Sequence, residues 1–200
     1  SSAASDVYKR QFETLIQQFP QSSLARKAGI QSGLLYFNDN QPEKAATAYK
    51  QVISNYPGSE EARVALQDLK SVYIDLNDIN SYANYVNSLG GNIRLEVGEQ
   101  DSLTYIAAEK LFNRGNNEEA RRSLINYLQT FPEGAFSSNA NYYLGSIAFS
   151  KKEYDEALQR YAPVCRRNSP REHPFPKSGH SSCSALPVFR PRKGIELTRR

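Results

Sequence analysis

The chain has 200 residues and a net charge of +4, of which residues 165–200 carry +7 and residues 1–11 carry +1, leaving −4 for residues 12–164. Because a negative balance repels phosphate, we expect no nucleic-acid partner for this central part. Residues 12–164 also hold no Cys, His, Met or Trp, so they offer no thiolate nucleophile, no histidine base and no histidine-based metal site.

The N-terminal segment, residues 1–11, is set apart from the rest of the chain. All eleven residues resemble an in-frame translation of a widely used transposase sequencing adapter. Agreement at every position is not expected by chance, so we interpret residues 1–11 as an adapter-derived, non-native segment. We therefore expect the natural reading to start near Phe12 and leave the segment out of the fold prediction.

The central part contains a recurring alanine. Ala45, Ala120 and Ala157 each come just after an acidic residue and four residues before a tyrosine or leucine, and Tyr82 marks a degenerate copy. These four positions are 37, 38 and 37 residues apart. A period of this size is typical of stacked helical hairpins and makes a catalytic function less expected.

Each repeat predicts two helices joined by a turn. In the first complete unit, apolar and small residues at helical spacing predict helices over residues 24–36 and 43–55. Pro42 suits the first turn of the second helix, where a missing N–H costs little. Pro57 cannot continue that helix, and Ser59 is the expected N-cap of the next one.

The third unit has the loosest pattern. It keeps Tyr73, but Lys70 and Tyr82 stand where the other units have small residues. A polar stretch from Ile93 to Asp101 follows, and we expect it to be a widened loop between repeats or a hinge.

The pattern stops after Val164. Five of the ten prolines fall between Pro170 and Pro191. Both cysteines and both histidines of the chain also lie in this stretch, at Cys165, His173, His180 and Cys183. Their spacing matches no familiar compact zinc site. We interpret residues 165–200 as a frameshifted, disordered tail. The alternative is a genuine basic tail that binds anions or a membrane.

The order of residues in the units resembles the tetratricopeptide repeat family. Gly33 and Tyr36 ahead of Ala45, Tyr49 and Pro57 follow that family's order of a small residue, an aromatic, alanine, an aromatic and proline. The order returns at Leu144, Gly145, Ala157 and Tyr161. The family's usual period is about 34 residues, so the longer spacing is a departure.

One junction points to a subgroup of that family. The run Phe19-Pro20-Gln21-Ser22-Ser23-Leu24-Ala25 resembles bacterial envelope proteins, such as the lipoprotein of the outer-membrane β-barrel assembly machine and the Tol-Pal cell-division coordinator. The resemblance implies an all-α, right-handed α-solenoid over residues 12–164, with about four repeats of which the first is partial.

The function implied by the resemblance is a non-catalytic scaffold that binds another protein or peptide. It further implies a fragment of a larger bacterial envelope protein, located in the periplasm or at the outer membrane. The alternative is a regulatory module of a larger enzyme or signalling protein, with the cytoplasm as the alternative location. No catalytic, cofactor-binding or metal-binding residue is predicted, and no apolar run approaches the roughly 18 residues of a membrane span.

The predicted binding surface is the inner, concave face of the solenoid, formed by the first helix of each unit. Its candidate residues are Lys27, Tyr105, Glu109, Asn139 and Tyr142. A mixed aromatic and polar surface of this kind holds an extended or helical peptide. We expect Tyr105, Asn139 and Tyr142 to be exposed. The aromatic residues at the neighbouring position have two open interpretations, exposure on this face or packing between repeats: Phe37, Phe112 and Phe149.

Overall fold

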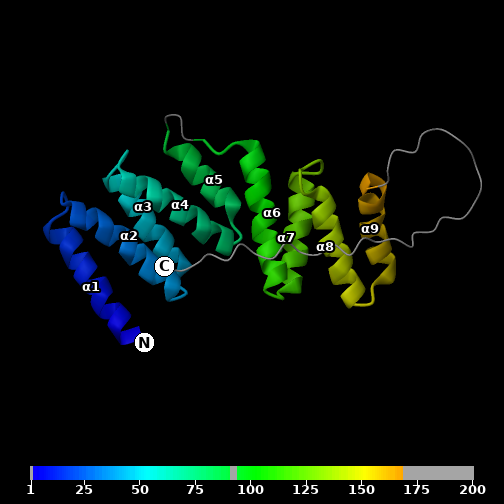
Figure 1. Cartoon of the computed structure of the whole chain (residues 1–200), viewed down its shortest axis with the longest axis horizontal. Helices are drawn as coiled ribbons and strands as arrows, with labels where there is room; N and C mark the ends of the chain where they lie inside the picture. The colour runs from blue at the N-terminus through cyan, green and yellow to red at the C-terminus, as the bar shows by residue number, and fades with distance from the viewer. Residues whose placement is uncertain (1, 91–93, 169–200) are drawn as a thin grey trace, which may run out of the picture. The chain divides into compact units, whose positions relative to one another are not determined.

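The computed structural model describes residues 2–90 and 94–168, which form nine helices and no strand (Figure 1). The helices are α1 (Ser2–Gln18), α2 (Ser23–Asn38), α3 (Pro42–Asn55), α4 (Glu60–Asp75), α5 (Ile79–Ser88), α6 (Val97–Asn113), α7 (Asn117–Thr130), α8 (Ser137–Ser150) and α9 (Tyr154–Asn168). The predicted all-α fold of helix-turn-helix units is confirmed. Most of the predicted tail, from residue 169 on, lies outside the described residues.

The helices pack in chain order. The first helices of the pairs are α2, α4, α6 and α8, and their second helices are α3, α5, α7 and α9. Each helix contacts the next one along the chain. In addition, α4 contacts both α2 and α6. Helix α1 precedes the first pair and runs without a break from the predicted adapter segment into the residues after it.

Every first helix ends in the same backbone conformation. Asn40, Asn77, Gly115 and Lys152 have φ values of 57°, 53°, 79° and 64°, and each lies two residues after the end of a first helix. They are 37, 38 and 37 residues apart. The following residue then turns its N–H back into the helix, as in the 2.9 Å bond to the Tyr36 carbonyl. This left-handed residue satisfies carbonyls that a helix end leaves unpaired.

The start signals read from the sequence are confirmed in the first units. The Ala62 N–H donates to Ser59 Oγ at 3.1 Å, so Ser59 caps α4 as predicted. Ser22 does the same for α2, accepting from the Ala25 N–H at 3.0 Å. Pro42 occupies the first turn of α3.

The recurring residues lie inside the fold. Ala45 and Ala120 are 0% exposed, Tyr82 is 2% exposed and Ala157 is 3% exposed. Each lies on the second helix of its pair. Their burial explains why the position is restricted to residues that fit between two crossing helices.

Glycines on two first helices allow the close approach of a tyrosine. A Cβ added at Gly33 would lie 2.5 Å from Cε1 of Tyr49, and one added at Gly145 would lie 2.6 Å from Cε1 of Tyr161. Both distances are far below the roughly 3.5–4.0 Å optimum between carbon atoms. The tyrosine of the second helix therefore packs directly on the backbone of the first.

The sequence predicts a loop or hinge from Ile93 to Asp101, and this prediction is wrong for residues 97–101. Helix α6 begins at Val97, and Asp101 is a buried helical residue. Its carboxylate accepts from the Tyr127 hydroxyl at 2.5 Å and from the Ala135 N–H at 2.8 Å. These long-range bonds hold the polar residue inside the fold, and Gly134 lies so close that a Cβ there would meet Tyr127 and Asp101. Residues 91–93 lie outside the described residues.

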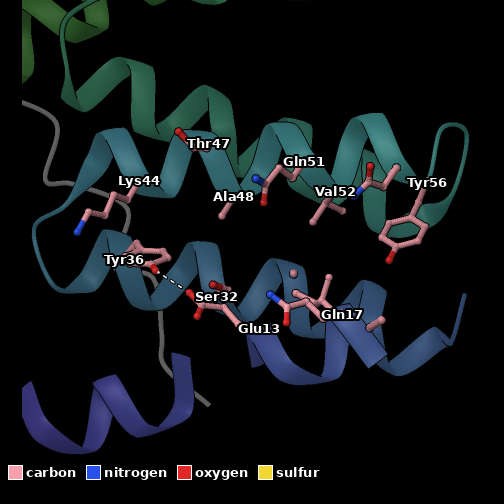
Figure 2. A pocket seen from close by; sticks show the side chains of 14 residues that line it. Glu13, Gln17, Ser32, Tyr36, Lys44, Thr47, Ala48, Gln51, Val52 and Tyr56 are labelled. Atoms are coloured by element: carbon pink, nitrogen blue, oxygen red, sulfur yellow. Dashed lines mark hydrogen bonds between the residues drawn. The ribbon is translucent and has the colours of Figure 1, made fainter. Parts of the chain in front are cut away.

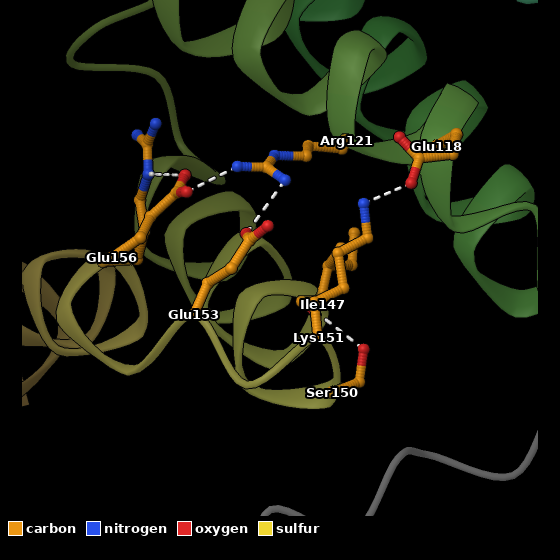
Figure 3. Close-up of polar contacts among 8 residues, drawn as sticks. Glu118, Arg121, Ile147, Ser150, Lys151, Glu153 and Glu156 are labelled. Atoms are coloured by element: carbon orange, nitrogen blue, oxygen red, sulfur yellow. Dashed lines mark hydrogen bonds and ion pairs between the residues drawn. The ribbon is translucent and has the colours of Figure 1, made fainter.

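Ion pairs join consecutive units near their turns (Figure 3). Arg121 of α7 contacts Glu153 at 3.0 Å and also Glu156. Lys151, in the turn before α9, contacts Glu118 at the start of α7. Exposed pairs contribute little one by one, but a cluster fixes how the two units meet.

Candidate functional site: a tyrosine-held glutamate on α6 and α8

Two tyrosine hydroxyls bind the carboxylate of Glu109, a half-buried residue of α6. The Tyr105 hydroxyl, one turn earlier on α6, donates to Glu109 Oε1 at 2.8 Å. The Tyr143 hydroxyl of α8 donates to the same oxygen at 2.8 Å. We call these three residues the Glu109 cluster. Within the described residues, Oε2 of Glu109 accepts no hydrogen bond.

The two hydroxyl donors stay protonated. Burial, together with the bond to Glu109, raises the pKa of Tyr105 well above its usual value. Burial first, and then the bond to Glu109, raises the pKa of Tyr143 to about 12. The cluster therefore keeps both hydroxyl donors throughout the physiological pH range.

The predicted exposure of Tyr105 is wrong. Its side chain is only 3% exposed. Phe136 covers it, with ring centroids 4.5 Å apart and planes within 6° of parallel, and Tyr127 meets it edge-on at 5.8 Å. Phe136 lies in the junction before α8, so helical spacing within α6 alone gave no sign of it. Tyr105 acts as a buried support of Glu109, not as a contact surface.

Tyr142 is the exposed aromatic residue of this region. Its exposed fraction is 39%, as its place on the helix face predicted. Its ring lies 5.8 Å from that of Tyr143 and 5.9 Å from that of Tyr161. Asn139 is half-buried on the same helix, with its side chain near the Tyr105 hydroxyl. The structure therefore links Asn139 to Glu109 through Tyr105, and it places Tyr142 beside Tyr143, which also bonds Glu109.

Lys27 is not part of this group. It is an exposed residue of α2, and no hydrogen bond or ion pair within the described residues joins it to the other candidates. The three phenylalanines with two open interpretations differ in their exposure. Phe37 and Phe112 pack against neighbouring side chains, Phe112 at 4.6 Å from the Tyr143 ring. Phe149 is 60% exposed.

Sequence reasoning missed Tyr143. Its hydroxyl joins α8 to Glu109 of α6, but it follows Tyr142 directly, and helical spacing assigned only one of the two to the binding face. The one available signal was the tyrosine pair itself, directly after the small and polar residues 137–141.

The arrangement is suited to holding a partner group. A half-buried carboxylate fixed by two neutral hydroxyls presents one open oxygen to a donor, and a charge-assisted hydrogen bond there is about twice as strong as a neutral one. Among residues 2–90 and 94–168, no group of His, Cys, Asp or Glu side chains is placed to hold a metal ion. No described helix is long and apolar enough to cross a membrane.

Comparisons with known proteins address the repeats. Residues 28–59 match one tetratricopeptide repeat model, and residues 107–171 match another. Neither match includes residues 60–106, which contain α4 and α5, the unit with the loosest pattern. No curated protein matches the chain.

Several solved structures are similar to the chain. One is MamA, with a TM-score of 0.38 and 15% identity over 83% of this chain and 90% of MamA. Another is the putative kinesin light chain of Podospora anserina with nearly identical TPR-like repeats, with a TM-score of 0.38 and 12% identity over 82% of this chain and 85% of that one. A third is MamA of Desulfovibrio magneticus, with a TM-score of 0.33 and 11% identity over 81% and 93%.

The identity of the repeats rests on the two sequence matches and on the paired helices that carry them. Both matched segments lie in stretches where a first helix is followed, after a turn with a left-handed residue, by a second helix. Residues 28–59 and 107–171 therefore match tetratricopeptide repeats in sequence and in the order of their helices.

Proposed function

We propose that the chain is a non-catalytic protein-binding scaffold that holds a peptide segment against α6 and α8. The observation that carries this proposal is the Glu109 carboxylate, which two tyrosine hydroxyls orient. One of them belongs to Tyr143, whose ring lies 5.8 Å from the exposed ring of Tyr142. Tetratricopeptide repeats in general mediate protein interactions, which supports this proposal. An aromatic anchor beside a fixed charge is the kind of pair that dominates binding energy at protein interfaces.

The proposed partner presents a basic residue next to an apolar one. Its guanidinium or ammonium group donates to Oε2 of Glu109, and its apolar side chain packs on Tyr142. The net charge of −4 on residues 12–164 favours the approach of a basic segment.

The proposed setting is a bacterial envelope, where the repeats form part of a larger protein on the periplasmic side. Its support is the junction at residues 19–25, which resembles envelope members of the family. The lack of cysteine in residues 12–164 also suits an oxidising compartment. The full reading frame tests this setting: a secretion or lipoprotein signal upstream is expected, whereas an attached kinase, transferase or DNA-binding domain would overturn it.

A binding experiment tests the site itself. Linear peptides with a fixed Arg-Leu pair are selected on the purified chain, and their affinities are measured by calorimetry for Glu109→Gln and Tyr142→Ala variants. Glu109→Gln keeps the shape of the side chain but removes its charge, so we expect about tenfold weaker binding. Tyr154→Ala, which removes an exposed aromatic residue of α9, is the matched control. Equal affinities for all four proteins would refute the proposal.

A further inference from the structure

We propose that the chain has a second binding site, on the side of the second helices, where a polar groove between α1 and α3 takes an extended peptide by its main chain. This inference does not depend on the Glu109 cluster, because it concerns other helices and other residues.

The groove is a cavity of about 630 Å³. Residues of α1 and α3 form its two walls, and residues of α2 form its floor (Figure 2). This volume lies within the roughly 300–1,000 Å³ that is common for ligand sites.

The floor of the groove consists of small side chains. Ala25, Gly29 and Ser32 are buried and follow one another on a single face of α2. Tyr36 lies at the end of this row, with its hydroxyl donating to Glu13 of α1 at 3.2 Å. A Cβ added at Gly29 would lie 2.5 Å from Cγ2 of Val52, so these small residues let α3 pack closely on α2. A peptide in the groove would therefore contact mainly the side chains of the two walls.

The walls carry carboxamide groups on both sides. Gln17 comes from α1, and Gln51 and Asn55 come from α3, so that Gln17 and Gln51 face each other across the groove (Figure 2). None of the three side-chain carboxamides makes a hydrogen bond within the described residues. Each carboxamide offers both a donor and an acceptor, and an extended peptide presents N–H and C=O groups to both sides. The groove therefore fits a main chain better than it fits one particular side chain.

A second groove, of about 410 Å³, lies beside α7 and is lined by residues at equivalent positions of that repeat. Positions are compared by counting from the left-handed residue that ends each first helix. Gln51 lies eleven residues after Asn40, and Asn126 lies eleven residues after Gly115. Asn126 lines the second groove just as Gln51 lines the first. The units of α3 and α7 thus share a carboxamide at this place, and both line a groove with it.

The unit between them differs at both positions, and Ser88 stands eleven residues after Asn77 in place of a carboxamide. Ala48 lines the first groove and Ser123 the second, each eight residues after the left-handed residue. The middle unit has Tyr85 at this place, and its ring lies 4.9 Å from the Lys50 ammonium of α3. A large side chain here reaches across to the preceding second helix and fills the space that a small residue leaves open.

A peptide is favoured over a sugar as the occupant. Sugars stack on exposed aromatic rings, but Tyr56, at one end of the groove, is only 9% exposed, and Tyr36 is half-buried with its hydroxyl engaged. Charged groups of both signs, Glu13 and Lys44, line the same groove, so it selects neither an acidic nor a basic segment.

The test uses a random linear dodecapeptide library, displayed on phage and selected on the full 200-residue chain. Selected peptides are then titrated by calorimetry against an Ala48→Tyr variant, which gives α3 the residue that α5 already has at that position. We expect Ala48→Tyr to weaken groove-binding peptides at least tenfold while circular dichroism stays unchanged. Gln51→Ala should weaken them about fivefold, the size expected for one net hydrogen bond.

Three controls show whether the peptides bind in this groove and by their main chains. Gln129→Ala, at an exposed residue of α7, should leave the affinity unchanged, and so should Glu109→Gln. Peptides with N-methylated main chains should lose binding. The proposal is overturned if every selected peptide binds Ala48→Tyr as well as the parent chain, if N-methylation has no effect, or if cellohexaose binds the groove and peptides do not.

Discussion

Gly33 permits a close contact between the two helices of the first pair, which makes Gly33→Ala a direct test of how the repeat packs. The added Cβ would lie 2.5, 2.7 and 2.8 Å from Cε1, Cζ and Cδ1 of Tyr49. Tyr49 is 2% exposed, and its hydroxyl interacts with Asp68 of α4, so the ring has no room to turn away. Either the ring or one of the two helices has to move.

Two opposing effects set the size of the change. Alanine in place of glycine inside a helix stabilises by about 1 kcal/mol. Overpacking in a rigid core typically costs about 1–3 kcal/mol, and three overlaps with one buried ring place Gly33→Ala at the upper end of that range. We therefore expect a net loss of about 1–2 kcal/mol in the free energy of unfolding.

The matched control is Gly145→Ala. The equivalent overlap there, at 2.6 Å, is with Tyr161, which is only half-buried on the last described helix. Because that ring can move, the helix preference and the overlap should nearly cancel, and the change should stay within about 0.5 kcal/mol.

Urea denaturation followed by circular dichroism measures both variants. In a Tyr49→Leu background the overlap is gone, and Gly33→Ala should then be neutral or stabilising. A loss of stability that is the same with and without the tyrosine ring would show that the overlap is not its cause.

The other predictions concern the turns and the buried polar contacts. Lys152→Gly should stabilise the chain by about 0.5–1 kcal/mol in the same assay, because glycine adopts its φ of 64° without the strain that lysine carries. Tyr127→Phe should lose about 1–3 kcal/mol, because it removes the hydroxyl that donates to the buried Asp101. The hydrogen bond from Lys151 lowers the pKa of Glu118, so this carboxylate stabilises the fold above its unfolded pKa and loses that effect as pH falls through its folded pKa. Lys151→Ala should return the pKa of Glu118 to its ordinary range in an NMR titration.

Features set by neighbouring residues could be predicted from the sequence. Ser59 caps α4, Pro42 opens α3 and Pro57 follows its end, because a cap or a proline acts on its own helix whatever packs around it. The turn between the two helices was predicted, but its left-handed residue was not, although asparagine at positions 40 and 77 tolerates this conformation.

The site depends on contacts between units, and these could not be read from helical spacing. Tyr105 is buried because Phe136, from a junction more than one helix away, stacks on it. Glu109 is oriented because Tyr143 reaches it from the next pair. A residue's place on a helix face predicts its direction, but its exposure also depends on which side chains of the neighbouring unit cover it.

Position 85 offers the opposite experiment to filling the groove. If a small residue at this place opens a groove between second helices, then Tyr85→Ser, which introduces the residue found at Ser123, should create one between α3 and α5. The variant loses the contact with Lys50, worth about 0.5–1 kcal/mol at an accessible site, together with part of the ring's burial. Peptides that bind the parent groove should then titrate with one additional site per chain. If Ala48→Tyr removes binding but Tyr85→Ser adds none, then a large residue at this position blocks a groove, but a small residue there is not enough to form a binding site. Recognition must then depend on the carboxamides of the walls.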